Sequence, residues 1–347
     1  MKQEPAPPSH ARVCPPDPPH ARPSKTIAAG LILALLLGLF HPSAIAADGG
    51  VRLSPRLDQG RTLSYDISRT LRVQQTPGTA PGGSDAPVTP VVSSTTLDLA
   101  VRLDVGSVRA DGTTEVAVEV QSLLLAIESG GVTRSFRHPS ETPEADRAEP
   151  ARPSAIEMVG KALVVSKPRI VINREGGVGE ILGLDNLEEV MTAAGKLDRT
   201  VSAVELSMWG PESLRELLLP MFQPSAPESP ARVLNPADRW TVRRTVDLAS
   251  LGSLVIDESW TMDAAHGEGA AASGVVTVTP MPPRGIVSAA PTLELGAAAG
   301  KASLAWDTSA ASLTAFSRAL DVTINLTLGD IRVSQTQSST TSINRRN

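Results

Sequence analysis

Imidazole and thiol side chains, which carry much of enzyme chemistry, are scarce in this sequence. Downstream of residue 47 the histidines are His138 and His266, and the one cysteine, Cys14, lies upstream. A general-base histidine must be held within hydrogen-bond reach of its partners by rigid neighbours. His138 begins a Pro-rich acidic stretch, His266 lies in a Gly/Ala-rich turn, and no Gly-x-Ser-x-Gly elbow occurs. We therefore predict that the protein is not an enzyme and has no catalytic residues.

Metal coordination would have to rely on carboxylates. Zinc and copper sites of ordinary composition need cysteines or clustered histidines, which the chain after residue 47 lacks. Calcium is bound by oxygen ligands, and Asp257, Glu258, Asp263 and Glu268 fall around one predicted hairpin. No loop signature orders these four side chains as a calcium site. We predict no metal and no other cofactor, and we interpret the four carboxylates as strand and turn charges.

The stretch RIVINREGGVGEILGLDNLEEV, residues 169–190, carries glycines that could form a nucleotide-binding loop. A dinucleotide fingerprint needs its glycines to open a helix directly after a strand, so that the N–H groups of the helix face the pyrophosphate. Here Asp185-x-x-Glu188 forms a capping box, which places the start of the helix after the last glycine. We therefore predict a hairpin, with strands at 169–173 and 178–182, followed by the cap of a helix.

Charge and aromatic content restrict the partners. The net charge is −5, the charges are scattered without a basic stripe, and aromatic residues make up 3% of the chain. Nucleic-acid binding depends on a basic surface and often on aromatic stacking. We predict no nucleic-acid and no nucleotide partner, and we interpret the four tryptophans as packing residues. The remaining partners are an unknown envelope protein or an apolar ligand, with a membrane contacted only transiently through the leader.

The amino-terminal region has the features of an export leader sequence. Residues 25–47, KTIAAGLILALLLGLFHPSAIAA, combine a positive flank, an apolar run and the small-x-small site Ala44-Ile45-Ala46, which is the pattern of a secretory signal peptide. The apolar run is shorter than the roughly 18–20 residues that span a bilayer. We predict cleavage near Ala46 and a periplasmic or secreted protein, with an uncleaved anchor in the inner membrane as the alternative. Residues 1–24 are a Pro-rich extension that we expect to be disordered.

Alternation of apolar and polar residues dominates the rest of the chain. In LSYDISRTLRV and LDLAVRLDV every second residue is apolar, and only Arg69 interrupts the pattern. Such strands have one wet face, which is typical of antiparallel sheets. Several of these runs exceed ten residues, against a usual length of about 5–6, and long strands in one sheet must twist and curl.

The chain is predicted to form one domain of the α+β class, mostly β. We expect a large curved antiparallel sheet, half-open and barrel-like, with two short amphipathic helices packed on it. This domain covers residues 52–343, with mobile loops at 76–90 and 138–154, a helical segment at 184–222 and a polar tail at 344–347. The first helix should end near Gly195 and the second near Pro220, and each should place its apolar stripe on the sheet.

Several motifs resemble an uncharacterised family of exported bacterial β-rich proteins, known only as a domain of unknown function. They are LSYDISRTL, GGVGEILGLDNLEEVM, NPADRWTVRRTVDL and GKASLAWDTS, and the likeness covers roughly residues 52–343. The resemblance implies export and a β-rich fold, but it supplies no catalytic or binding residues. The expected fold also looks like the half-open barrels of periplasmic lipoprotein and lipid carriers.

These observations predict an exported envelope protein that acts as a non-enzymatic binding or scaffold module. The alternative is a periplasmic carrier that holds a lipid or another apolar ligand between the curved sheet and the helices. Binding pockets of that kind are concave and mostly apolar. The candidate lining residues for the carrier are Leu187, Val190, Met191, Leu214 and Leu218.

Overall fold

A computed structural model describes residues 50–77, 89–139, 154–174, 176–197, 208–222, 233–247, 253–266, 269–281, 292–328 and 331–346. The predicted signal peptide and the extension before it lie outside the described residues.

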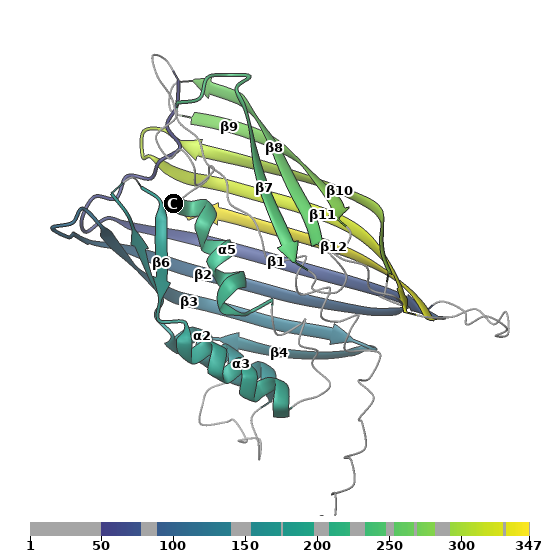
Figure 1. Cartoon of the computed structure of the whole chain (residues 1–347). Coiled ribbons are helices and arrows are strands. Elements are labelled where there is room, and N and C mark those ends of the chain that lie inside the picture. The colour runs from purple at the N-terminus through teal and green to yellow at the C-terminus, as the bar shows by residue number, and fades with distance from the viewer. Residues whose placement is uncertain are drawn as a thin grey trace, which may run out of the picture.

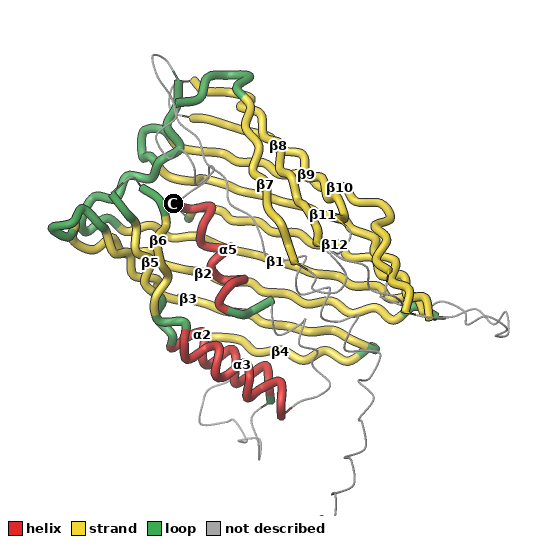
Figure 2. Tube along the Cα trace, viewed as in Figure 1, coloured by secondary structure: helices red, strands yellow, loops and turns green. Residues whose placement is uncertain are grey.

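Most of the described chain belongs to one twelve-stranded antiparallel sheet (Figure 2). The strands are β1 (Thr62–Pro77), β2 (Val91–Val108), β3 (Thr114–Ser129), β4 (Val132–His138), β5 (Arg169–Ile172), β6 (Val178–Leu182), β7 (Arg239–Asp247), β8 (Ser253–His266), β9 (Gly269–Met281), β10 (Thr292–Asp307), β11 (Ser312–Leu328) and β12 (Ile331–Arg345). Their order is β6-β5-β3-β2-β1-β12-β11-β10-β9-β8-β7, and β4 also pairs with β3. The first strand therefore pairs with the last, and the sheet is not closed.

Three helices accompany the sheet in the described part of the chain: α2 (Ala155–Val165), α3 (Asp185–Leu197) and α5 (Pro211–Phe222). α2 packs against β3 and β4, α3 packs chiefly against α2, and α5 contacts β11 and β6. Figure 1 shows the curved sheet, with β7 running steeply across the direction of β1 and with α5 in front of the central strands. The predicted class and the half-open antiparallel sheet are therefore confirmed.

Strands that follow one another along the chain pair as hairpins through much of the sheet, and the predicted hairpin at 169–182 is formed by β5 and β6. The pairs β2–β3, β3–β4, β5–β6, β7–β8, β8–β9 and β11–β12 are all antiparallel neighbours. Register shifts interrupt several ladders, as between Ala100 and Val101 in β2 and between Met262 and Ala264 in β8. Such bulges bend a strand and increase its twist, which helps strands as long as the 18 residues of β2 to follow the curvature.

The inner face of the sheet, which carries the core, follows the predicted alternation. On β1 the side chains of Tyr65, Ile67 and Leu71 are buried, whereas Asp66 and Arg72 are exposed. The tryptophans are packing residues, as predicted: those at positions 209, 260 and 306 are fully buried and that at 240 is half-buried. Trp240 stacks on Trp260 with 5.9 Å between ring centroids and an interplanar angle of 5°.

Helix α2 was not predicted, and it begins directly after the expected loop at 138–154. Residues 140–153 of that loop lie outside the described residues, and only its first residue falls in a strand. His138 closes β4, and Ser154 is the N-cap of α2. The Ser154 backbone N–H donates to Glu157 Oε2 (2.8 Å) and the Glu157 N–H donates to Ser154 Oγ (3.3 Å), which completes a capping box. Gly160 lets the helix approach β4 closely, since a Cβ there would lie 2.1 Å from Phe136 Cδ1.

The predicted helices exist, but three details of the prediction are wrong. α3 runs through Gly195 to Leu197, and α5 continues past Pro220 to Phe222. A proline in the last turn costs one backbone hydrogen bond, while Met221 and Phe222 both become buried. α3 places its stripe on α2 rather than on the sheet. Within the expected loop 76–90, Thr76 and Pro77 extend β1, and residues 78–88 lie outside the described residues.

Candidate functional site

The residues considered for catalysis are not brought together by the strand order. His138 ends β4 beside one edge of the sheet, and His266 ends β8 near the other edge. The glycine stretch is the predicted hairpin: the Asn173 N–H donates to the Gly177 carbonyl (2.8 Å), and the Gly177 N–H donates to Asn173 Oδ1 (2.7 Å). α3 begins only after this hairpin.

The carboxylates considered for calcium point in different directions. Asp257 forms a two-pronged ion pair with Arg243 on the outer face (2.7 and 2.9 Å), and this contact holds the pKa of Asp257 below its usual value. Glu258 is buried on the inner face, and Asp263 accepts a hydrogen bond from Ser273 (2.9 Å). Glu268 lies outside the described residues. Among the described residues no group of three or more metal-ligating side chains occurs.

The predicted apolar lining is only partly assembled. Leu214 and Leu218 of α5 face the inner side of β2 and β3 together with Leu163 of α2. Leu187, Val190 and Met191 belong to α3, which packs against α2, and they are not part of this lining. The space left between α5, α2 and the sheet is about 20 Å³. That is room for roughly one water molecule, whereas ligand pockets have volumes of about 300–1,000 Å³.

A buried ion pair fixes α5 to the sheet. Arg69, the residue that interrupts the alternation of β1, is 1% exposed and lies 3.5 Å from Glu216 Oε2. Its Nη1 donates to Ser213 Oγ (2.6 Å), and this hydroxyl donates to the Met208 carbonyl (2.5 Å). Burial lowers the pKa of Arg69, and Glu216 counteracts that shift. The charge of Arg69 is therefore compensated by the helix that covers it.

A line of polar side chains runs along the inner face of β12. Gln335, Gln337, Ser339 and Thr341 occupy alternate positions and are all buried. Thr341 lies between Arg69 of β1 and Arg318 of β11, in register with both. Gln337 lies between Val73 and Val322. Within the part of the chain that the structure describes, the Nε2 atoms of Gln335 and Gln337 have no hydrogen-bond partner.

The concave face continues beyond the region that α5 covers. Val322, Ile324 and Leu326 of β11 and Val276 of β9 are buried. They do not belong to the cluster of described core residues that includes α5, α2 and the inner face of β1–β3. These aliphatic rows flank the polar line of β12 on the side away from β1.

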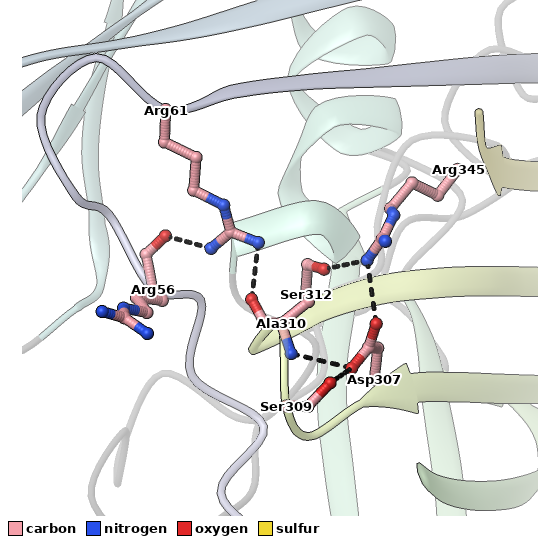
Figure 3. Close-up of polar contacts among 7 residues, drawn as sticks. All are labelled: Arg56, Arg61, Asp307, Ser309, Ala310, Ser312 and Arg345. Carbon is pink, nitrogen blue, oxygen red and sulfur yellow. Dashed lines mark hydrogen bonds and ion pairs between the residues drawn. The ribbon is translucent and has the colours of Figure 1, made fainter. Parts of the chain in front are cut away.

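A second polar cluster closes the rim of the sheet where β10 turns into β11 (Figure 3). Arg345 Nη1 lies 3.2 Å from Asp307 Oδ2 and donates to Ser312 Oγ (2.6 Å). Asp307 also accepts from the Ala310 N–H and the Ser309 hydroxyl (2.8 and 2.7 Å), and these bonds hold its pKa below the usual value. These contacts tie Arg345 of β12 to the turn between β10 and β11, so we interpret this cluster as a structural latch.

Arg61 extends the latch to the segment before β1, because it donates to the carbonyls of Arg56 and Ala310 (both 2.5 Å). Beside the latch a cleft of about 540 Å³ is lined by Arg52, Ser54 and Thr308, among others. A cleft of about 510 Å³ crosses the outer face of β1–β4, where Asp66 and Asp98 lie. Asp66 is paired with Arg346 (2.6 Å) and Asp98 accepts from Ser68 (2.6 Å).

Sequence reasoning missed the ion pair and the polar line. The break in alternation at Arg69 was a signal that a buried charge needed a partner, but Glu216 lies on a helix far along the chain. β12 carries polar residues on both faces, as in SQTQSSTTS, so its pattern did not reveal which side chains are buried. Among the described residues, no helix has the length and apolar character needed to cross a membrane.

Comparison with known proteins gives little further information. No protein-family model and no curated protein matches the chain. A structure of lipid–protein interactions in lipovitellin matches 84% of this chain and 26% of that chain, with 8% identity and a TM-score of 0.42. An outer membrane channel from Pseudomonas putida F1 matches 88% and 100%, with 7% identity and a TM-score of 0.20. The chain thus spans about a quarter of the lipovitellin chain, and likeness at these TM-scores establishes neither a common fold nor a common function.

Proposed function

We propose that the protein is a non-enzymatic binding module of the cell envelope, and that it binds on the part of its concave face beyond α5. The observation that carries this proposal is the contrast between two parts of that face. Under the helices the space is about 20 Å³, too small for a ligand. Beyond them, buried aliphatic rows on β9 and β11 lie outside the helix-covered core of described residues.

A ligand held between the helices and the sheet, the alternative suggested by the sequence, is less well supported. Leu214 and Leu218 pack against β2 and β3 and leave a space of only about 20 Å³. The buried contact of Arg69 with Ser213 and Glu216 also holds α5 in place. Breaking one partner of such a pair is costly, which makes α5 a poor lid for ligand entry.

The location outside the cytoplasmic membrane rests on residues 25–47 and their signal-peptide pattern. Mass measurement of the protein taken from the envelope of its own host tests this part of the proposal. An amino terminus near Ala47 is expected, and an intact Met1 in that fraction would contradict export by cleavage.

The place of binding is tested with an uncharged fluorescent hydrocarbon, diphenylhexatriene, and two variants. Val322→Thr puts a hydroxyl into the aliphatic row beyond α5 and should weaken binding of the probe. Leu218→Ala opens a cavity under α5 and should leave the affinity unchanged while lowering stability. The opposite pattern, with binding altered by Leu218→Ala and not by Val322→Thr, would place the ligand under the helices.

A further inference from the structure

Two neighbouring inner-face residues of β12 hold hydrogen-bond donors that are buried and unused. Gln335 is 5% exposed and Gln337 is 3% exposed, and the Nε2 atom of each lacks a partner among the described residues. A buried donor without a partner is expensive, and more than nine in ten buried polar groups are satisfied in native proteins. Two such donors at successive inner-face positions need an explanation.

Other buried donors without a described partner are of a different kind. Apart from the Nε–H of Arg69, whose guanidinium is held by Ser213 and Glu216, they are the indole N–H groups of Trp209, Trp240 and Trp306 and the hydroxyl of Tyr65. In these side chains the large apolar ring gains from burial and carries one polar atom with it. A glutamine has no such apolar bulk, and Val or Leu would fill the same position without an unsatisfied group. The pair on β12 therefore points to a ligand rather than to packing.

The surroundings of the two carboxamides are uncharged and, apart from Gln75, apolar. Gln337 is flanked by Val73 and Val322, and Gln335 by Gln75 and Ile324. Arg69 and Arg318 are in register with Thr341, four residues from Gln337 and so roughly 13 Å along the strand at about 3.3 Å per residue. No cation of the described strands is therefore in register with either glutamine, so a phosphate or carboxylate would be poorly compensated.

The two groups without a partner are N–H donors. The ligand must therefore bring hydrogen-bond acceptors. A peptide brings one N–H for every carbonyl, whereas the atoms of this pair that are buried without a partner are the Nε2 donors alone and not the Oε1 acceptors. An ester brings carbonyl acceptors and no donor. We propose that Gln335 and Gln337 form a subsite for the ester carbonyls of an uncharged acyl lipid, whose chains lie on the rows of Val322 and Ile324. This inference rests on the proposed binding function.

The first test compares a diacylglycerol that carries a pyrene-labelled chain with its dialkyl ether analogue, which lacks both carbonyls. Delipidated full-length protein is titrated with each probe, and affinity is read from the pyrene fluorescence. Two hydrogen bonds to neutral acceptors should make the diester bind about tenfold more tightly. Equal affinity for both probes would overturn the subsite but leave the apolar face as the binding surface, whereas binding of neither probe would overturn the proposed function itself.

The second test removes the donors. In Gln335→Leu/Gln337→Leu the preference for the diester should disappear, and the midpoint of thermal unfolding of the lipid-free protein should rise by about 2 °C or more because unsatisfied groups are gone. Gln74→Leu is the matched control, since Gln74 is exposed on the opposite face of the neighbouring strand, and it should keep the preference. A double variant that unfolds at lower temperature, or that keeps the preference, would show that the glutamines are structural.

Discussion

The inner faces of β1 and β12 lie side by side in one sheet. They differ in whether their buried polar side chains have hydrogen-bond or ion-pair partners. On β1 a single arginine interrupts an apolar row, and a helix supplies Ser213 and Glu216 as its partners. On β12 the buried row is polar from Gln335 to Thr341, and two of its amide donors have no described partner. The bonded arginine on β1 holds α5 on the sheet. The unbonded amide donors on β12 are the groups for which we propose a ligand.

The largest loss of stability is expected when the buried ion pair between Arg69 and Glu216 is broken. Arg69→Met leaves Glu216 buried without its arginine and should lower the free energy of unfolding by about 3–5 kcal/mol. Arg69→Met/Glu216→Leu removes both charges and should recover most of that loss. Urea denaturation of the two variants measures the difference.

The surface pair Arg243–Asp257 provides the control for this comparison. Arg243 is 71% exposed, so Arg243→Met should lower stability far less than Arg69→Met, because exposed ion pairs contribute little. If Arg69→Met lowered stability no more than Arg243→Met does, the buried pair would not hold α5 on the sheet.

The packed state of the helix-covered region predicts the next largest effect. Leu218→Ala should lower the free energy of unfolding by about 2–5 kcal/mol, because a cavity forms in a layer that now has almost no space. Val165→Ala on α2 is a suitable control, since that side chain is 64% exposed and should change stability by less than about 0.5 kcal/mol. A small loss in Leu218→Ala would mean that the layer is loosely packed, and the contrast between the two regions would fail.

These contrasts show how far the sequence could predict the structure. The hairpin at 169–182 and the long strands were predicted correctly because a Gly-rich turn and period-two alternation are local signals. α2 was missed because Gly160 and several valines weaken its helical signal, although Ser154 and Glu157 cap it. The buried ion pair and the buried polar row of the inner face were missed because the partner of Arg69 lies on a distant helix and because β12 is polar on both sides. Both features depend on which strands become neighbours, and a single-sequence pattern does not contain that information.

The smallest effect is expected at the rim latch, which is fully partnered and partly exposed. Hydrogen bonds from Ala310 and Ser309, with Arg345 nearby, lower the pKa of Asp307 in the folded protein. Its contribution is therefore present above the unfolded-state pKa of about 3.9 and is lost as the pH falls through the lower folded-state value. Asp307→Asn should cost less than about 1 kcal/mol at pH 7.

The pH dependence of thermal unfolding checks this sign. The difference between wild type and Asp307→Asn should be constant from pH 5 to 8 and should vanish toward pH 2. A difference that grows as the pH falls would contradict the pairing seen at the rim.

The most direct test of the contrast between the two regions is native mass spectrometry of protein purified gently from the cells that naturally make it. Wild type and Leu218→Ala should both carry the added mass of an uncharged ester lipid, and Gln335→Leu/Gln337→Leu should carry little or none. Equal lipid on all three proteins, or lipid lost only from Leu218→Ala, would contradict a binding face centred on β12.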